Sequence, residues 1–345
     1  MQQQHAVFPI DPEGRLDPAA ATYLLLSMTK RCNLRCNGCY FMQQQEDFFV
    51  NSEIPLPQAK VIVDYYHNLG IRQVVPDAEG ESLLYRDYQT LIAYINAKGF
   101  PNRPWLVTNG TLLKRHADFI VGNLKEVLIS IDGPDAQSYN AFRGGNQALF
   151  DKVTDGVKGL VATARPRWPR PEIIINHVIT RDRLEQMGRM IALAEELGVD
   201  TIKFSNFHPI GEAGDYRPLY VTDREVIAEM ERIMRRRDYR VWIFLPNLFG
   251  RQHPPFMCRM LASVVIGANG DFAPCCRIMP DARWGSFFDS PDRHNGEALR
   301  TFRRQVLGAR SIDELPAQCR ECSHLAPIRA LFLPDKRQWV RAHIS

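Results

Sequence analysis

The regular alternation of short apolar runs with longer amphipathic segments constrains the fold of this chain most. Apolar, β-prone runs lie at 22–28, 73–76, 104–108, 126–131, 172–179 and 201–207. Between them, apolar residues recur with helical spacing at about 57–69, 86–98, 112–122, 146–162 and 182–197. Gly70 and Gly198 follow two of these segments, where a helix would end. The repeated strand–helix units predict an α/β fold with a parallel sheet, either open or closed into a barrel.

Composition narrows the class of protein further. The 345 residues suit one large domain with a small appendage, and the net charge of +4 is too mild to indicate nucleic-acid binding. No apolar run approaches the roughly 20 residues that span a bilayer, and the first residues lack the layout of a signal peptide. We therefore expect a cytoplasmic protein with no membrane contact, in which the eight cysteines serve as metal ligands rather than disulfides.

Three of these cysteines, Cys32, Cys36 and Cys39, follow the first apolar run on one short loop. Three thiolates can hold three irons of a four-iron, four-sulfur cluster and leave the fourth iron without a protein ligand. The alternatives are a zinc site or three unrelated buried thiols, but zinc usually takes four ligands from paired cysteine knuckles. The spacing therefore predicts an iron–sulfur cluster with one open iron.

Short polar motifs follow the next three predicted strands. They are Ala78-Glu79-Gly80-Glu81-Ser82, Thr108-Asn109-Gly110 and Ser130-Ile131-Asp132-Gly133, the last followed by Arg143-Gly144. Functional residues of parallel α/β folds gather where the strands end at their carboxyl side. Each motif alone also suits an ordinary turn or helix cap, so the prediction depends on their order and position together.

The C-x3-C-x2-C spacing and these motifs resemble the radical S-adenosylmethionine (SAM) superfamily. The resemblance implies a partial (β/α)6 TIM-like barrel that binds a 4Fe-4S cluster and SAM. In that family the open iron takes the amino and carboxylate groups of SAM. The reduced cluster cleaves SAM to a 5′-deoxyadenosyl radical, which abstracts a substrate hydrogen. An electron donor such as flavodoxin or ferredoxin is also implied.

The resemblance assigns SAM contacts to individual residues. Gly80 and Glu81 match the family's Gly-Gly-Glu-Pro, but Glu79 replaces the first glycine, which leaves open which glutamate meets the SAM ammonium. Further SAM-binding residues are implied by the T-N-G and S-x-D-G…R-G patterns and by the aromatic residue after the last cysteine: Thr108, Asn109, Ser130, Asp132, Arg143 and Tyr40. Of these, Ser130 and Arg143 are placed to take the SAM carboxylate, and Tyr40 to meet the adenine.

A second cysteine set follows a predicted linking helix at 223–237. Cys258 precedes a predicted β-hairpin at Asn269-Gly270, Cys275 and Cys276 follow it, and Cys319 and Cys322 lie beyond a helix at about 296–306. This arrangement resembles the SPASM and twitch regions of radical SAM enzymes. It implies a second, auxiliary Fe-S cluster on Cys258, Cys275, Cys319 and Cys322; a structural zinc site is the alternative. Cys276 is a substitute for Cys275, a buried thiol without a ligand role, or a hydrogen donor in catalysis.

The predicted organisation is a lead-in at 1–21, the barrel at 22–215, a linker helix and strand at 216–250, an α+β auxiliary-cluster domain at 251–330 and a tail at 331–345. The predicted function is a radical SAM oxidoreductase that oxidises or cross-links a peptide or a small natural product. Only about twenty residues precede the barrel, which lowers the weight of a peptide substrate. An epimerase that uses Cys276 as its hydrogen donor is one alternative. A non-catalytic iron–sulfur or zinc scaffold, or an electron-transfer protein, is another.

Overall fold

The computed structural model describes residues 9–39, 41, 53–77, 79–208, 216–220, 222–236, 238–249, 258–320, 322 and 325. The strands are β1 (Leu24–Ser27), β2 (Val74–Asp77), β3 (Trp105–Thr108), β4 (Glu126–Ser130), β5 (Glu172–Ile179), β6 (Thr201–Asn206), β7 (Trp242–Phe244), β8 (Val264–Ile266) and β9 (Phe272–Ala273). The helices are α2 (Leu56–Asn68), α3 (Tyr88–Ala97), α4 (Leu113–Asn123), α5 (Ala136–Arg143), α6 (Gln147–Ala164), α7 (Gln186–Leu197), α8 (Arg224–Arg235), α9 (Glu297–Gly308) and α10 (Ala317–Arg320).

The strands form two sheets, with orders β2-β1-β8-β9 and β3-β4-β5-β6-β7. Strand β1 pairs in parallel with β2 and with β8, and the pairs β4–β5, β5–β6 and β6–β7 are also parallel. The antiparallel pairing of β8 with β9 forms the predicted hairpin. The predicted α/β class is thus confirmed, and the two open, largely parallel sheets are consistent with a partial, unclosed barrel.

The chain divides into two compact units, which are described separately below. Unit 1 comprises Met1–Cys32, Asp47–Leu106 and His253–Arg320, and unit 2 comprises Asn33–Glu46, Val107–Gln252 and Glu321–Ser345. Strand β3 passes from one to the other.

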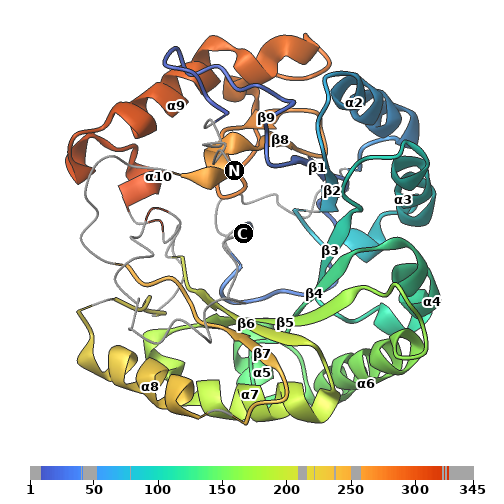
Figure 1. Cartoon of the computed structure of the whole chain (residues 1–345), viewed down its shortest axis with the longest axis vertical. Coiled ribbons are helices and arrows are strands. Elements are labelled where there is room, and N and C mark those ends of the chain that lie inside the picture. Colours follow the sequence, from blue (N-terminus) through green and yellow to red (C-terminus); the bar gives the residue numbers. More distant parts are fainter. Residues whose placement is uncertain are drawn as a thin grey trace, which may run out of the picture. The chain divides into compact units, whose positions relative to one another are not determined.

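In unit 1 the hairpin extends the sheet that contains β1 (Figure 1). The sequence predicts a separate auxiliary-cluster domain over 251–330, but the register pairs Leu24 with Val264 and Leu26 with Ile266. Val264, Val265 and Ile266 are all buried, so the strand shares the apolar core of β1. The predicted domain boundaries remain a prediction. Strand β8, which the prediction assigns to the auxiliary-cluster domain, pairs with β1 in the first sheet.

The helices of unit 1 follow the apolar spacing of the sequence. In α2 the buried residues are Ala59, Ile62, Val63 and Tyr66, which recur at helical spacing. Gly70 follows the helix with φ of +83°, a left-handed conformation that glycine adopts at little cost. The expected helix end at Gly70 is confirmed.

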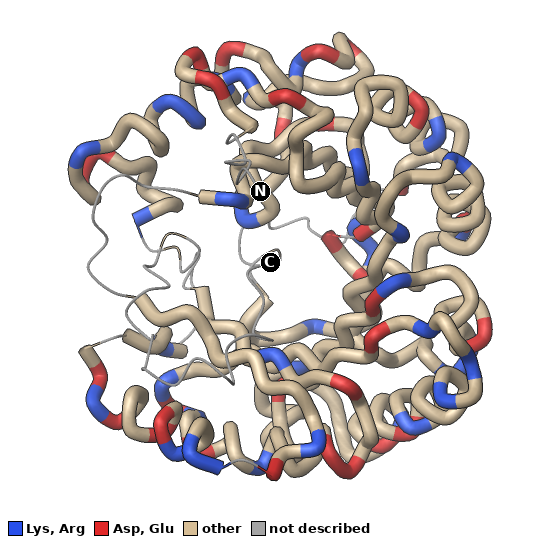
Figure 2. Tube along the Cα trace, viewed as in Figure 1, with Lys and Arg blue, Asp and Glu red and all other residues tan. Residues whose placement is uncertain are grey.

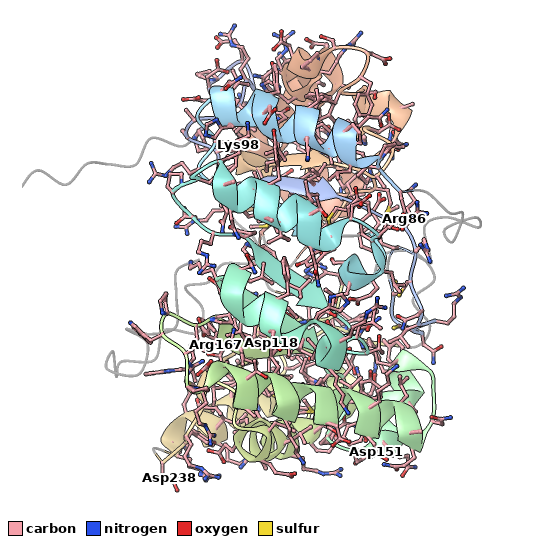
Figure 3. All side chains as sticks on the ribbon, turned by 90° about the vertical axis from the view of Figure 1, so that its right-hand side faces the viewer. Arg86, Lys98, Asp118, Asp151, Arg167 and Asp238 are labelled. Atoms are coloured by element: carbon pink, nitrogen blue, oxygen red, sulfur yellow. The ribbon has the colours of Figure 1, made fainter. Side chains whose placement is uncertain are left out.

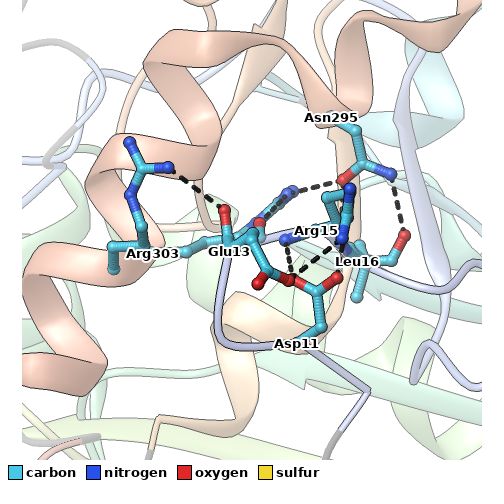
Figure 4. Close-up of polar contacts among 8 residues, drawn as sticks. Asp11, Glu13, Arg15, Leu16, Asn295 and Arg303 are labelled. Atoms are coloured by element: carbon cyan, nitrogen blue, oxygen red, sulfur yellow. Dashed lines mark hydrogen bonds and ion pairs between the residues drawn. The ribbon is translucent and has the colours of Figure 1, made fainter.

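The N-terminal segment of unit 1 is held against α9 by polar contacts (Figure 4). Asn295 Oδ1 accepts a hydrogen bond from the Leu16 amide at 2.8 Å, and its Nδ2 donates to the Leu16 carbonyl at 2.9 Å. The guanidinium of Arg303, which is 1% exposed, donates to the Gly14 carbonyl and to Asn295 Oδ1. The segment predicted as a lead-in is therefore fastened to the unit from residue 14 to residue 16.

In unit 2, helices α6 and α7 lie along one face of the sheet formed by β4, β5 and β6 (Figure 1). The loop after α6 is fixed by two ion pairs, between Arg167 and Asp118 at 2.7 Å and between Arg170 and Asp200 at 2.6 Å. Figure 3 shows Arg167 and Asp118 beside each other on the outer surface. Their exposure makes this pair a minor contribution to stability.

The six strands expected between residues 22 and 207 are all present, and the structure adds α5, which the sequence reasoning missed. Residues of both charge signs are interspersed along the helices (Figure 2). Within the described part of the chain, no helix is long and apolar enough to cross a membrane.

Candidate functional site

The loop from Asn33 to Cys39 belongs to unit 2, whereas Cys32 is the last residue of the first segment of unit 1. None of the eight cysteines forms a disulfide, and Cys32, Cys36 and Cys39 are half-buried. The contacts that hold the loop come from two places in unit 2: the turn after β3 and the end of α5.

The turn after β3 holds the start of the loop through Asn33. Asn109 Nδ2 donates to Asn33 Oδ1 at 2.8 Å, and Asn33 Nδ2 donates to Thr111 Oγ1 at 2.9 Å. Asn109 Oδ1 accepts from both the amide and the hydroxyl of Thr111. Thr108 supports the turn by accepting from the Gly110 amide at 3.1 Å. The Thr-Asn-Gly motif thus braces the cysteine loop.

The end of α5 holds the middle of the loop. The Asn37 amide donates to the Phe142 carbonyl at 2.9 Å, and Asn37 Nδ2 donates to the Ala141 carbonyl at 2.8 Å. Gly38 lies so close to the Phe142 ring that an added Cβ would meet it at 2.4 Å. This close approach explains why no aromatic residue stands directly before Cys39.

Arg143, the last residue of α5, connects the loop to the motif after β4. Its Nη1 donates to Cys36 Sγ at 3.6 Å, and its Nη2 forms an ion pair with Asp132 Oδ2. The Arg143 side chain is 13% exposed and that of Asp132 is 0% exposed. Burial raises the pKa of Cys36, and the positive charge of Arg143 opposes that rise.

Asp132 is itself fixed by β5 and by the segment that follows. Its Oδ1 accepts from the Val178 amide at 2.6 Å, and Arg183 donates to its backbone carbonyl at 2.9 Å. His177 lies next to it, with Nδ1 3.0 Å from the Ile131 carbonyl. Burial lowers the pKa of His177 to about 4, so the imidazole is neutral near pH 7. His177 is therefore part of the support for Asp132.

The motif after β2 lies against the end of β1 in unit 1. The amides of Glu79, Gly80 and Glu81 donate to Ser27 Oγ, to the Thr29 carbonyl and to the Arg31 carbonyl, at 3.1, 3.1 and 2.7 Å. An added Cβ on Gly80 would lie 2.1 Å from the Arg31 carbonyl oxygen, so only glycine fits there. This backbone pairing holds the residues that lead into Cys32.

The two glutamates of this motif have different surroundings. Glu81 Oε1 accepts from the Leu83 amide at 3.2 Å and so caps the short helix Ser82–Leu84. The Glu79 side chain is 4% exposed, and its carboxylate lies near the Ala268 amide and the Ser27 hydroxyl, which both lower its pKa. Burial raises the pKa of Glu79, an effect that the charge of Lys30 partly opposes.

The two remaining predicted SAM-binding residues are Ser130 and Tyr40. Ser130 is buried at the end of β4, where its register partner on β5 is Asn176. Tyr40 lies outside the described residues. The roles of all the predicted SAM contacts remain predictions.

The C-terminal cysteines do not all fall in one unit. Cys258, Cys275, Cys276 and Cys319 belong to unit 1, and Cys322 belongs to unit 2. Cys258 and Cys275 are buried, and Cys276, Cys319 and Cys322 are half-buried. Cys276 Sγ lies 3.7 Å from the thioether of Met260, to which the Tyr23 hydroxyl also donates at 3.7 Å. The auxiliary cluster, and the choice between Cys275 and Cys276 as its ligand, remain predictions.

The donor set of the first loop suits an iron–sulfur cluster. It offers thiols not consumed by disulfides, and a buried cation at Cys36 can compensate the negative charge of a thiolate. Across the ranges that the structure describes, no three His, Cys, Asp or Glu side chains are close enough to share one metal ion. The thiolates of a four-iron cluster bind different irons, so they need not meet at one point.

Sequence reasoning missed two parts of this site, Asn33 and the ion pair of Arg143 with Asp132. Asn33 lies between two cysteines, and its partners come from 76 and 78 residues further on. A helix signal was present for α5, because Asp135 Oδ1 caps it by accepting from the Ser138 amide at 2.8 Å.

Comparison with known proteins places these features in a family. The profile described as the radical SAM superfamily matches residues 26–166. An AdoMet-dependent heme synthase of Nitratidesulfovibrio vulgaris is 31% identical over 188 residues, which are 54% of this chain and 48% of that protein. The chain thus spans about half the length of that relative. A probable GTP 3′,8-cyclase of Saccharolobus solfataricus is 23% identical over 83% of this chain and 91% of its own.

Solved structures share the fold. SuiB of Streptococcus suis, bound to the precursor peptide SuiA, matches with a TM-score of 0.65 and 15% identity, covering 88% of this chain and 70% of SuiB. Native anSMEcpe with bound AdoMet matches with a TM-score of 0.63 and 18% identity, covering 87% of this chain and 88% of its own.

The profile match includes Cys32, Cys36 and Cys39 and the motifs after β2, β3 and β4, up to and beyond Arg143. Residues 26–166 of this chain form a radical SAM domain.

Proposed function

We propose that this protein is a radical SAM enzyme whose catalytic cluster is held by Cys32, Cys36 and Cys39. The observation that carries the proposal is the bracing of the cysteine loop. Asn109, Asn37 and Arg143 hold it by hydrogen bonds, and Arg143 brings a buried positive charge to a thiolate ligand. A solvated turn with three unrelated thiols would need neither the bracing nor the charge.

When bound, the cluster and SAM supply a 5′-deoxyadenosyl radical that removes a hydrogen atom from the substrate. The residues of the chain would bind and orient the two groups. The bracing keeps the loop in one geometry, so little reorganisation is needed when they bind. Ser130, at the end of β4, would contact the SAM carboxylate. Arg143 Nε, which has no hydrogen-bond partner in the described residues, would contact it too.

Glu79 is the better candidate for the SAM ammonium. Its carboxyl group is buried beside Lys30, the Ala268 amide and the Ser27 hydroxyl, whereas Glu81 already caps a helix. A buried carboxylate is costly, and a bound ammonium would supply both charge and further donors. Glu79→Gln should therefore weaken SAM binding by about tenfold or more, the effect of losing a charge-assisted hydrogen bond. Glu81→Gln should weaken it less, because an amide oxygen can still cap the helix.

Isothermal titration of the reconstituted protein with SAM checks this assignment. Equal losses in both variants, or a larger loss in Glu81→Gln, would contradict it. Iron content, measured in parallel, excludes a lost cluster as the cause.

We propose a peptide as the substrate and oxidation or cross-linking as its modification. SuiB and anSMEcpe, which share the fold, were solved with peptides bound, and anSMEcpe also with AdoMet. The second cysteine set would hold an auxiliary cluster on Cys258, Cys275, Cys319 and Cys322 that takes an electron from the substrate radical. A small-molecule substrate is the second candidate, because the curated relatives include a heme synthase and a GTP cyclase.

Anaerobic reconstitution with iron and sulfide, followed by dithionite and SAM, tests the function. Formation of 5′-deoxyadenosine that is lost in Cys36→Ala is the expected result. A protein that binds zinc and leaves SAM intact, or one that accepts electrons but ignores SAM, would overturn the proposal.

A further inference from the structure

The guanidinium of Arg143 lies between the Cys36 sulfur and the Asp132 carboxylate. Its Nη1 is 3.6 Å from Cys36 Sγ, and its Nη2 pairs with Asp132, whose side chain is fully buried. Burying a guanidinium costs desolvation free energy, which its ion pair and hydrogen bonds must offset. The contact with sulfur uses a donor that the ion pair with Asp132 leaves available.

The guanidinium cannot easily move away from the sulfur. Asp132 is tied to β5 by the Val178 amide at 2.6 Å, and Arg143 is at the end of a helix whose last carbonyls receive the Asn37 contacts. The carboxylate and the thiolate ligand are therefore held on different nitrogens of one planar cation. The positive end of this fixed pair points at the sulfur, and its negative end lies farther away.

Resting on the proposed function, we propose that Arg143 raises the reduction potential of the cluster bound at Cys36, and that Asp132 limits this increase. Adding an electron makes the cluster more negative. A cation that donates a hydrogen bond to a ligand sulfur stabilises the reduced state more than the oxidised state. The carboxylate of Asp132 offsets part of that positive field. Arg143 is thus a positioning residue with an electrostatic effect on the cluster.

The proposal predicts shifts of opposite sign in two variants. In Arg143→Met the hydrogen bond and the charge are lost, and the midpoint potential becomes more negative. At a fixed applied potential the ratio of reduced to oxidised cluster should fall about tenfold, as expected for a lost charge-assisted hydrogen bond. In Asp132→Asn the cation loses its counter-charge, and the midpoint potential becomes less negative. Arg143→Lys, which keeps the charge, should lie between Arg143→Met and the unaltered protein.

The measurement is a redox titration followed by electron paramagnetic resonance, carried out on the full reconstituted chain without SAM. Omitting SAM separates this effect from any contact of Arg143 with the SAM carboxylate. The signal that Cys36→Ala lacks identifies the cluster in question. Arg183→Gln is the matched control, because its guanidinium contacts the Asp132 and Val178 carbonyls rather than the cysteine sulfur. The control should shift the potential less than Arg143→Met.

Failure of this inference and failure of the proposed function give different results. If no cluster depends on Cys36, the proposed function fails and this inference with it. If the cluster assembles with unchanged iron content but Arg143→Met leaves its potential unaltered, only this inference is overturned. Shifts of the same sign in Arg143→Met and Asp132→Asn would also overturn it. If Asp132→Asn does not fold, the midpoint potentials of the other proteins test the inference. They should rise from Arg143→Met through Arg143→Lys to the unaltered protein, and any other order would overturn it.

Discussion

Cys36 and Cys276 have contrasting surroundings. Cys36 has a buried guanidinium 3.6 Å from its sulfur, supplied by Arg143 and balanced by Asp132. Cys276 lies instead beside the neutral thioether of Met260, which also accepts from the Tyr23 hydroxyl. Burial raises the pKa of Tyr23, so its hydroxyl stays neutral at physiological pH.

The difference in charge indicates different chemistry at the two cysteine sets. A cation stabilises a thiolate and an added electron, which suits a cluster that must be reduced before it acts. The neutral thioether of Met260 supplies no such charge. It suits either a neutral thiol at Cys276 that gives up a hydrogen atom or a neighbouring cluster that accepts an electron from the substrate radical. The following predictions test this comparison, beginning with the largest expected effect.

Loss of a ligand should separate the two cysteine sets most clearly. Under the proposed function, Cys36→Ala abolishes SAM cleavage and lowers the iron content from about eight to about four per chain. Cys258→Ala should lower the iron content by the same amount and leave the Cys36-dependent cluster in place. Iron and sulfide assays with electron paramagnetic resonance measure both. Loss of all iron in Cys258→Ala would show that the two sites are not independent.

Arg303→Ala should destabilise unit 1 by about 4 kcal/mol, because a large buried side chain is removed and the Gly14 carbonyl loses its donor. Denaturant unfolding of the apoprotein measures the effect. The exposed Arg304→Ala is a matched control and should change the free energy of unfolding little. Because α9 shares unit 1 with Cys258, Cys275 and Cys319, whereas Cys36 and Cys39 belong to unit 2, iron bound at the C-terminal set should fall before iron at Cys36. The reverse order would contradict this division.

His177 should make the stability of unit 2 depend on pH. Its pKa is about 4 in the folded protein and 6.5 as the reference value, so the unfolded chain binds the proton more readily. The stabilisation is complete above about pH 6.5 and is lost as the pH falls toward 4, up to about 3 kcal/mol. Unfolding curves between pH 7 and pH 4 measure it. His177→Gln should flatten this part of the profile, and an unchanged slope would exclude His177 as its source.

Asn109→Ala should have the smallest of these effects on stability. It removes the hydrogen bond to Asn33 and leaves Thr111 without its acceptor, at a cost of about 1–2 kcal/mol. We expect the iron content at Cys36 to fall while that at Cys258 is unchanged. Asn123→Ala, on the same unit at the end of α4, is the control. Equal iron loss in both variants would mean that Asn109 acts through stability alone.

Much of the fold could be predicted because local signals agreed with it. The apolar runs became strands β1 to β6 within one or two residues of their expected ends, and Gly70 and Gly198 end helices with φ of +83° and +72°. These features depend on the apolar period and on the conformational freedom of glycine, which are properties of short segments. The pairing of β8 with β1 is not such a property, because it joins residues 240 positions apart.

The sequence by itself determined the strand–helix alternation, the cysteine spacing and the motif after each strand, because each is encoded within a few neighbouring residues. Only the tertiary structure decided which side chains those motifs contact. It turned Asn109 toward Asn33, gave Glu81 a helix to cap and buried the Glu79 side chain. It also placed Arg143 between Asp132 and Cys36. Such contacts arise when distant segments pack together, so no local pattern specifies them. Once a polar or charged group is buried, it needs a hydrogen-bond or ion-pair partner to offset its lost hydration.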